Sequence, residues 1–390
     1  MMKIDPGKTH TFFSPTKVIM GMHTALQAAA EIKQLGGGKT LLATDPGVVG
    51  AGLLEPVTAS LEREDIEYVI YDGVEPEPPS RVIDKGAEIF KAESCDLILG
   101  IGGGSSLDAS KGISIVAGNK GRILDYCGMD QVPQKGAPLI LMPTTAGTGA
   151  EVTRGVVLTD EEKNMKNVVF SPYAIPDTAI VDPQLSFSMP PTVTADTGMD
   201  AMVHAIETYV SMNATVFSDI MAEQAIAWIA RYLPVAWSKG SNVEARNYMT
   251  MAATLAGFAF GSGGLGAVHG LAYPLGTEYH MNHGRTNAIM LSHIMAFNLS
   301  GNPVKYAKIA SLMGNDVRGL SPLEAAEVSV MAIQELLDTI KVSYRLGDYG
   351  IPESDLPKLV EGGMKQARLF VPNPRDLAEE DVRAIFENAF

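Results

Sequence analysis

Residues 96–106 read Asp-Leu-Ile-Leu-Gly-Ile-Gly-Gly-Gly-Ser-Ser, and this stretch decides the fold. Its apolar first half lacks polar alternation, which predicts a strand buried on both faces, and its second half predicts a tight turn into a helix. Glycines at such a turn let the backbone approach a diphosphate, and the helix N-terminus supplies N–H donors. Residues 100–105 match the GxGxxG fingerprint only loosely, because Ser105 takes the third glycine place. A plain tight turn in an α/β domain is the alternative interpretation.

Further apolar runs at residues 39–45, 67–71 and 138–142 have the same character. Helical patterns lie between several of them, for example over 82–92 and 106–116. Strands without polar alternation, spaced by helices, indicate a parallel sheet covered on both faces. We therefore expect residues 1–187 to form an α/β, Rossmann-like dinucleotide-binding domain.

A second loop supports a nucleotide site. The run 138–142 leads into Pro143-Thr-Thr-Ala-Gly-Thr-Gly-Ala-Glu151, which combines glycine with three hydroxyl side chains. Open α/β sheets bind ligands at the carboxyl ends of their strands. Two such loops at one sheet edge indicate a nucleotide crevice better than two unrelated turns do.

Asp45 ends the run 39–45 and is a candidate for the adenosine ribose. A carboxylate there could accept hydrogen bonds from the ribose hydroxyls and would repel a 2′-phosphate, which favours NAD over NADP. In the usual fingerprint the acid lies about 20 residues after the glycines, whereas here it precedes them. A helix N-cap before Pro46 is therefore the alternative role.

After about residue 190 the strand signals stop. Apolar spacing near 3.6 predicts helices over residues 195–212, 218–232, 243–260, 321–341 and 378–389. Pro190-Pro191 marks the expected boundary. We expect residues 188–390 to form an all-α domain that carries the metal and the catalytic residues.

Histidines gather in this helical half, where five of the seven lie between residues 204 and 293. Asp200 and His204 are spaced i, i+4, so on a helix they project from one face. Glu207 follows His204 by three residues and could support the pair from behind. A DxxxH pattern also arises by chance, and a histidine on a helix face is often a satisfied core residue.

His269 and His283 could complete the site. One aspartate and three histidines suit a divalent first-row cation, and the residue types do not decide between Fe²⁺ and Zn²⁺. His280 and His283 are spaced i, i+3, so the spacing alone leaves either of them as the last ligand.

Composition narrows the function classes. Hydrophobic residues make up 46% and charged residues 19%, and the net charge is −15. An acidic chain without a basic block is a poor candidate for nucleic acid or an anionic membrane. The start of the chain, Met1–Pro6, lacks the apolar stretch of a signal peptide, and Cys95 and Cys127 form no CxxC pair. We expect a cytoplasmic protein with Cys95 in the core.

Taken together, the motifs resemble the iron-containing (group III) alcohol dehydrogenases, relatives of glycerol dehydrogenase and dehydroquinate synthase. The similarity runs in consistent order through almost the whole chain. It includes Phe13-Ser-Pro-Thr-Lys17, Gly102-Gly-Gly-Ser-Ser-Leu-Asp-Ala-Ser-Lys111, Pro143–Thr153, Thr194–Glu207, Val268–Gly276, His283-Gly-Arg-Thr-Asn-Ala-Ile289 and Pro372-Asn-Pro-Arg375.

The resemblance implies a set of site residues, carried over position by position. The metal ligands would be Asp200, His204, His269 and His283. The dinucleotide would contact the loop Gly102, Gly103, Gly104 and Ser105, together with Asp45, Thr144, Thr145, Thr148, Lys166 and Leu185. The resemblance also implies NAD(H), a divalent metal that is Fe²⁺ before Zn²⁺, and a homodimer or larger homo-oligomer.

This sequence departs from the family pattern at positions near the chemistry. Many members have a second histidine four residues after the one matching His269, near the nicotinamide, whereas this chain has Tyr273. A tyrosine could relay the proton, although its pKa near 10 makes it a slower base, or it could only pack. Glu77 and Gly155 also stand where some members have asparagine.

Arg285 lies two residues after His283 and is the one substrate clue. A guanidinium facing the pocket would suit an anionic aldehyde, and a structural arginine is the alternative. We expect an NAD(H)-linked, metal-dependent alcohol dehydrogenase or aldehyde reductase. The alternatives are glycerol dehydrogenase-like polyol oxidation and a non-catalytic metal or nucleotide sensor.

Overall fold

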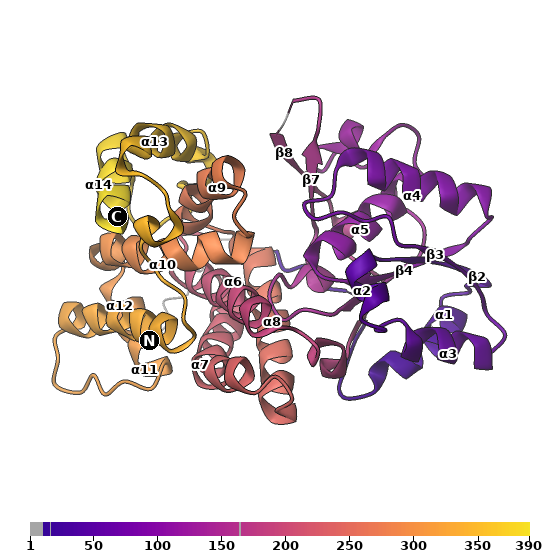
Figure 1. Cartoon of the computed structure of the whole chain (residues 1–390), viewed down its shortest axis with the longest axis horizontal. Helices are drawn as coiled ribbons and strands as arrows, with labels where there is room; N and C mark the ends of the chain where they lie inside the picture. Colours follow the sequence, from indigo (N-terminus) through magenta and orange to yellow (C-terminus); the bar gives the residue numbers. More distant parts are fainter. Residues whose placement is uncertain (1–10, 16, 164) are drawn as a thin grey trace. The chain divides into compact units, whose positions relative to one another are not determined.

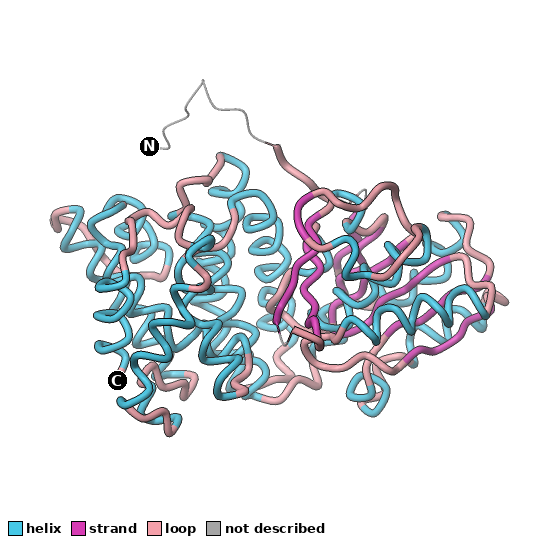
Figure 2. Tube along the Cα trace, turned by 90° about the horizontal axis from the view of Figure 1, so that it is seen from above, coloured by secondary structure: helices cyan, strands magenta, loops and turns pink. Residues whose placement is uncertain are grey.

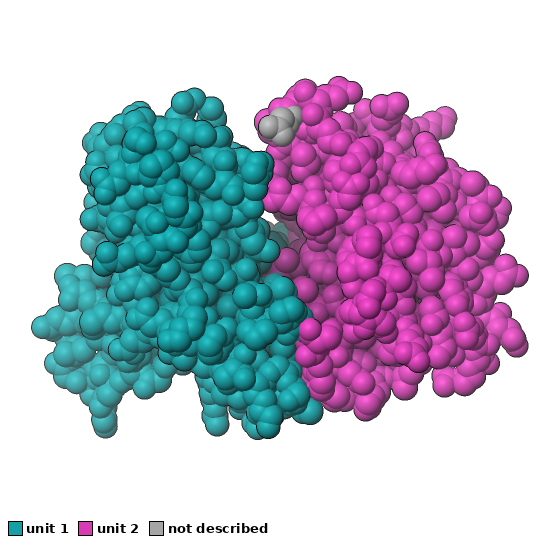
Figure 3. Space-filling model, in the orientation of Figure 1, with its two compact units in different colours: residues 1–12, 189–390 teal, residues 13–188 magenta. Residues whose placement is uncertain are grey.

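The computed structural model describes residues 11–15, 17–163 and 165–390, so Met1–Pro6 lie outside the described part. The chain divides into two compact units, drawn in different colours in Figure 3. One is Phe13–Ser188. The other is Met189–Phe390 together with Thr11 and Phe12.

The first unit is built on a six-stranded sheet in which every pair of neighbours is parallel. This confirms the predicted parallel sheet, with strand bounds that differ from the expected ones by one or two residues. In spatial order the strands are β1 (Lys17–Met20), β9 (Thr178–Val181), β6 (Leu139–Pro143), β4 (Leu97–Gly102), β2 (Lys39–Ala43) and β3 (Glu67–Tyr71).

Helices cover both faces of this sheet (Figures 1 and 2). Leu42 packs with residues of α1 (Ala28–Gln34) and α3 (Glu55–Arg63), whereas its neighbour Leu41 packs with residues of α4 (Ser80–Ala92) and α5 (Gly104–Gly118). Successive strand residues point to opposite faces, and both leucines are fully buried. This is why the strands carry no polar alternation.

Smaller elements complete the first unit. A three-stranded sheet has the order β5 (Gly128–Met129), β8 (Met165–Phe170) and β7 (Gly155–Asp160), with β7 and β8 antiparallel. The remaining helices are α2 (Pro46–Gly50), η1 (Thr24–Gln27), η2 (Ile123–Tyr126), η3 (Ala150–Val152), η4 (Pro172–Ala174) and η5 (Pro183–Ser186). The buried Lys111 of α5 donates to the Gly155 carbonyl over 2.9 Å and so ties β7 to that helix.

The second unit is helical, as predicted, and its described residues contain no strand. Its α-helices are α6 (Pro191–Val210), α7 (Val216–Ser238), α8 (Val243–Gly263), α9 (Ala267–Tyr279), α10 (His283–Asn298), α11 (Pro303–Leu312), α12 (Pro322–Thr339), α13 (Leu356–Met364) and α14 (Glu379–Ala389). Short 3₁₀ turns are η6 (Leu299–Gly301), η7 (Leu346–Tyr349), η8 (Glu353–Asp355) and η9 (Ala367–Leu369).

Helix α6 lies at the centre of this unit. It packs against α7, α8 and α10, and nearly every residue from Thr194 to Val210 is buried. A helix buried on almost all sides can hold polar groups only if they are paired or serve a ligand. That requirement draws attention to Asp200, His204 and Glu207.

A helix that crosses a membrane must be both long enough and apolar enough. In the described part of the chain no single helix meets both requirements. The pair α8 and α9, bent by 108° at the break between them, meets them only when the two are taken together.

Candidate functional site

Helix α6 holds the first two candidate ligands. Asp200 and His204 are 3% and 4% exposed, and the His204 Nε2 atom lies 3.9 Å from the Asp200 Oδ1 atom. The i, i+4 spacing therefore does bring both side chains to one face of the helix.

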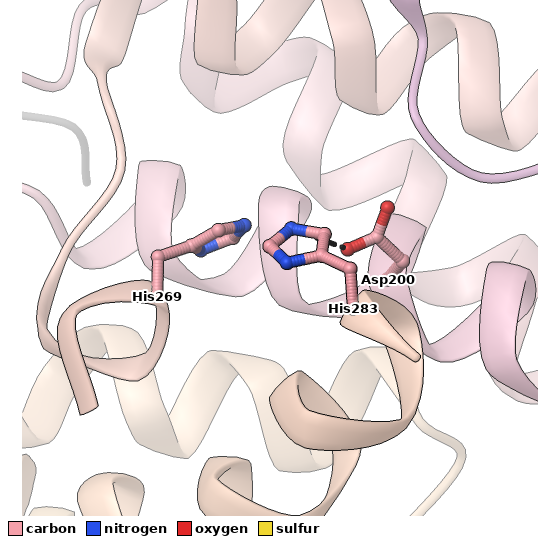
Figure 4. A group of neighbouring side chains, drawn as sticks. All are labelled: Asp200, His269 and His283. Atoms are coloured by element: carbon pink, nitrogen blue, oxygen red, sulfur yellow. Dashed lines mark ion pairs between the residues drawn. The ribbon is translucent and has the colours of Figure 1, made fainter. Parts of the chain in front are cut away.

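Helices α9 and α10 bring the other two histidines to the same place. His283 is the first residue of α10, and its Nε2 atom lies 3.7 Å from Asp200 Oδ1. Asp200, His269 and His283 each offer a ligand atom, and these atoms lie within 4.8 Å of one another (Figure 4). The His204 ring stacks on the His269 ring with 5.0 Å between centroids, so the fourth candidate is beside this group.

Gly284 allows α10 to begin so close to α6. A Cβ at this position would lie 2.2 Å from the Asp196 carbonyl oxygen, so any larger residue would push α10 away from α6. The preceding Asn282 caps α10 by accepting from the Gly284 N–H over 3.0 Å. Together these residues fix the position of His283 against Asp200.

Glu207 sets the orientation of His269. Its Oε2 atom is 2.5 Å from His269 Nδ1, and its Oε1 atom accepts from the Val268 N–H over 2.6 Å. Burial alone would lower the pKa of His269, but the Glu207 charge and hydrogen bond outweigh it and raise that pKa. When neutral, the imidazole keeps its proton on Nδ1, so the lone pair of Nε2 points away from Glu207.

Asp200 is ionised in this setting. Burial alone would raise its pKa, but the charges of His204, His283 and His269 and a hydrogen bond from Asn287 together lower it. The site therefore combines one buried carboxylate with imidazole nitrogens that converge on it. This donor set fits Fe²⁺ or Zn²⁺.

The structure separates the two histidines that spacing left open. His280 is exposed and ends α9 with a left-handed backbone (φ 54°), and it is not part of the converging group. Sequence reasoning missed Asn287, which is fully buried and whose amide nitrogen lies 2.8 Å from Asp200 Oδ1. Its i, i+4 spacing from His283 was the signal that could have found it.

Tyr273 and Arg285 lie near the histidines in different ways. The Tyr273 ring centroid is 6.4 Å from that of His283. The Arg285 guanidinium donates to Asp196 Oδ1 over 2.6 Å and to the Tyr349 hydroxyl over 3.4 Å. These bonds anchor the Arg285 guanidinium to other residues of the helical unit.

In the first unit, Asp45 lies against the glycine loop. Strand β2 lies between β3 and β4. The chain goes from β2 to β3 on one side of β2, and the next strand, β4, lies on the other side of β2. Ligands of open α/β sheets bind at such a reversal of strand order. The Ser106 hydroxyl donates to Asp45 Oδ2 over 2.7 Å. Asp45 also caps α2 by accepting from the Val48 N–H, so the alternative role is present as well.

Gly102 and Gly104 are required where the two loops meet, whereas a Cβ on Gly103 would make only an ordinary van der Waals contact. Gly102 has φ +152°, and a Cβ there would lie 2.5 Å from the Ser106 Cβ. A Cβ on Gly104 would lie 2.7 Å from the Thr148 methyl carbon, and one on Gly103 would lie 3.5 Å from that of Thr145. The Thr144 N–H donates to the Gly102 carbonyl over 2.9 Å.

The other candidates for nucleotide contact are placed less uniformly. Glu77 links two of them, because its N–H donates to the Ser105 hydroxyl and its carboxylate pairs with Lys166. Leu185 is buried in η5. Glu77, which stands where some members of the family have asparagine, thus forms an ion pair with Lys166.

Comparison with known proteins agrees with this geometry. Residues 15–183 match the model of the iron-containing alcohol dehydrogenases, and residues 194–390 match that of the family's C-terminal domain. The chain belongs to the iron-containing alcohol dehydrogenase family. It is 42% identical to the 1,3-propanediol dehydrogenase of Klebsiella pneumoniae over 91% of this chain and 92% of that protein. It is 35% identical to the sulfoacetaldehyde reductase of Bilophila wadsworthia over 97% and 98%.

A solved structure of 1,3-propanediol oxidoreductase superposes with a TM-score of 0.96 at 40% identity, covering 98% of this chain and all of that one. The expected family, fold class and enzyme class are thereby confirmed. This iron-containing alcohol dehydrogenase is an NAD-linked oxidoreductase of small alcohols or aldehydes.

Proposed function

We propose that Asp200, His204, His269 and His283 hold the catalytic metal of this alcohol dehydrogenase. The observation that carries the proposal is the convergence of three of these side chains on one point, with Glu207 fixing the tautomer of His269. His204 completes the set because it lies beside both Asp200 and His269. When bound, a divalent cation polarises the substrate oxygen, and NAD(H) accepts or supplies the hydride.

The residues of the chain have distinct parts in this chemistry. Asp200 supplies the negative charge that offsets the cation. Glu207 holds the proton at His269 Nδ1, so that Nε2 stays available as a ligand. Because Asp200, His204 and His269 are all nearly excluded from solvent, their electrostatic effect is stronger than it would be in water.

We propose that the glycine loop and Asp45 bind the dinucleotide, with Thr144, Thr145, Thr148, Lys166 and Leu185 completing the contacts. The support is that Asp45 and the loop are bonded through Ser106 where the strand order reverses. A carboxylate at the ribose disfavours a 2′-phosphate, so NAD is preferred over NADP. Residues 1–187 and 188–390 would then be the dinucleotide-binding and metal-binding domains.

For the substrate we propose a short, uncharged alcohol or aldehyde. The likeness to 1,3-propanediol dehydrogenase supports this. An anionic substrate would need a free guanidinium, and the Arg285 side chain is already bonded to Asp196 and Tyr349. The acidic net charge supports a protein that binds neither nucleic acid nor anionic membranes, and we expect a cytoplasmic homo-oligomer.

Tyr273 is proposed to help move the proton of the substrate hydroxyl, because its ring lies near His283. Tyr273→Phe keeps the ring and removes only the hydroxyl. We expect this exchange to lower turnover about a hundredfold, the smaller end of a general acid–base contribution. Unchanged turnover would show that Tyr273 only packs.

The test of the whole proposal is metal analysis coupled to a substrate panel. The enzyme is stripped with a chelator and reloaded with Fe²⁺ or Zn²⁺, and NADH absorbance is followed with short diols, alcohols and aldehydes. Turnover should disappear and return with the metal. Asp200→Ala should lose both metal and turnover. His293→Ala is the matched control, because His293 also lies on α10 but contacts the Tyr344 carbonyl instead. Full turnover of the metal-free enzyme would refute the proposal.

A further inference from the structure

Asn287 places one amide nitrogen at the centre of the candidate ligands. Its Nδ2 atom lies 2.8 Å from Asp200 Oδ1, 3.2 Å from His269 Nε2 and 3.2 Å from His283 Nε2. These are the same three atoms that would bind a cation. The side chain is fully buried, one helical turn after His283 on α10.

The other end of the amide is unsatisfied. Within the described part of the chain, no hydrogen bond reaches Asn287 Oδ1. Leaving a buried carbonyl oxygen without a donor is unfavourable. The contacts of Nδ2 with the three candidate ligand atoms therefore determine how the amide is oriented.

A cation and the amide compete for the same lone pairs. A neutral imidazole has one lone pair on Nε2, so it cannot accept from Asn287 and bind a metal at once. A carboxylate oxygen has two lone pairs, so Asp200 can do both. Metal binding must therefore break the contacts to His269 and His283 but can keep the one to Asp200.

We propose that Asn287 is a positioning residue that stands in for the cation in the metal-free enzyme. Its N–H groups hold Asp200 and the two histidines in place until a divalent cation displaces them. This inference rests on the proposed metal site and adds a residue that is not itself a ligand. It predicts that Asn287 stabilises the metal-free form more than the loaded form.

The prediction has a definite sign. Asn287→Leu keeps the branched shape of the side chain and removes both N–H donors. Because an amide nitrogen has two N–H groups, the metal-free protein loses about two hydrogen bonds, shared among the three acceptors, and the loaded protein loses only the one to Asp200. Metal should then bind more tightly to the variant, by roughly threefold to tenfold if one net hydrogen bond separates the two forms. A residue that supported only the loaded site would show the opposite change.

The experiment measures Zn²⁺ affinity by competition with a chromophoric chelator, at one fixed pH for every variant. Holoenzyme is purified and stripped of its metal. The stripped protein is then titrated with Zn²⁺, and the change in Tm on loading is measured. Asn298→Leu is the matched control, since Asn298 is an equally buried asparagine on α10 whose amide pairs with Asn373. Its Zn²⁺ affinity should equal that of the wild type.

Tighter binding and a larger thermal shift for Asn287→Leu support the proposal. Unchanged or weaker binding overturns it. If that variant does not fold, Asn287→Ala replaces it, because alanine also removes both N–H donors without adding a charge or a ligand atom, and it should tighten Zn²⁺ binding as well. Failure of the metal site itself would look different: wild type would not bind Zn²⁺, or Asp200→Ala would bind it as wild type does.

Discussion

Glu207 Oε2 and His269 Nδ1 lie 2.5 Å apart, and both residues are buried. Because the Glu207 carboxylate accepts a hydrogen bond from the Nδ1–H group of His269, Nε2 is the ring nitrogen that faces Asp200 and His283. Glu207 also accepts from the Val268 N–H, so it fixes the start of α9 together with the ring. The orientation of one candidate ligand thus depends on a residue of α6.

Glu207→Gln should weaken metal binding about tenfold to a hundredfold, the usual effect of removing such a carboxylate. The amide has nearly the same shape but lacks the charge that favours a proton on Nδ1. The measurement is Zn²⁺ affinity by chelator competition. Glu223→Gln is the control, because Glu223 bonds to the Tyr209 hydroxyl and not to a histidine. Equal affinities for the two variants would contradict the role assigned to Glu207.

The same pair predicts how pH affects the enzyme. Burial lowers the pKa of His269, but Glu207 and Asp200 raise it above its ordinary value. In the metal-free protein, the stabilisation from the protonated imidazole is complete below that ordinary value and is lost as pH rises through the raised one. Metal binding has the opposite dependence, because Nε2 must be free of its proton.

The increase in Tm on metal loading should therefore grow as pH rises above about 6.5, the ordinary imidazole pKa, and should continue to grow through the raised pKa of His269. In Glu207→Gln this growth should begin at lower pH, because the main cause of the raised pKa is gone. Thermal unfolding with and without Zn²⁺ across the range is the check. A metal-induced shift that is constant with pH would rule out a proton–metal competition at His269.

His283 and His280 give a direct test of the ligand set. His283→Ala should lose most of the bound metal, whereas His280→Ala should keep it, because His280 is exposed and lies outside the converging group. The His280 backbone is left-handed, but histidine and alanine both carry a Cβ, so the exchange should change the stability little. Metal content after gel filtration distinguishes the variants. Loss of metal from His280→Ala instead would reverse the assignment.

These two histidines also show how far the sequence could lead. The pair Asp200 and His204 was predictable because both lie on one regular helix. The choice between His280 and His283 was not predictable from spacing, since it depends on where α9 ends and α10 begins, and only the resemblance to the family favoured His283. Helix α9 contains Pro274, and neither it nor α10 was predicted as a helix.

Contacts between distant segments were beyond sequence reasoning as well. Asn287 meets Asp200 across 87 residues, and Glu77 meets Lys166 across 89. The spacing of apolar residues along the sequence does not predict such contacts, because they depend on how helices and strands pack. The sheet was predictable for the opposite reason, since its buried strands and glycine turn are local patterns.

Kinetic measurements should show that Arg285 supports the structure and does not bind the substrate. Burial raises the pKa of Asp196, although its bond to Arg285 opposes this, so removing the guanidinium leaves a poorly solvated carboxylate. Because both side chains keep some exposure to solvent, Arg285→Ala should destabilise by about 2 kcal/mol, less than a fully buried pair. The double variant with Asp196→Ala should be less unstable than the sum of the singles. Tm values test this, and a selective loss of activity on anionic aldehydes would contradict it.

Asp45 allows charge and capping to be tested separately. Asp45→Asn keeps an oxygen that can cap α2, and its amide nitrogen takes the place of the oxygen that accepts from Ser106, so the negative charge next to the glycine loop is removed. If the charge excludes a 2′-phosphate, the ratio of kcat/KM for NADP to that for NAD should rise at least about tenfold, with little change in Tm. Asp45→Ala removes both functions, so it should show the same change in cofactor preference and cost about 1 kcal/mol from the lost cap. A loss of stability in Asp45→Ala without any change of preference in either variant would leave Asp45 as a helix cap alone. Both exchanges remove the charge and only Asp45→Asn keeps the cap, so a change of cofactor preference that they share can be assigned to the carboxylate charge.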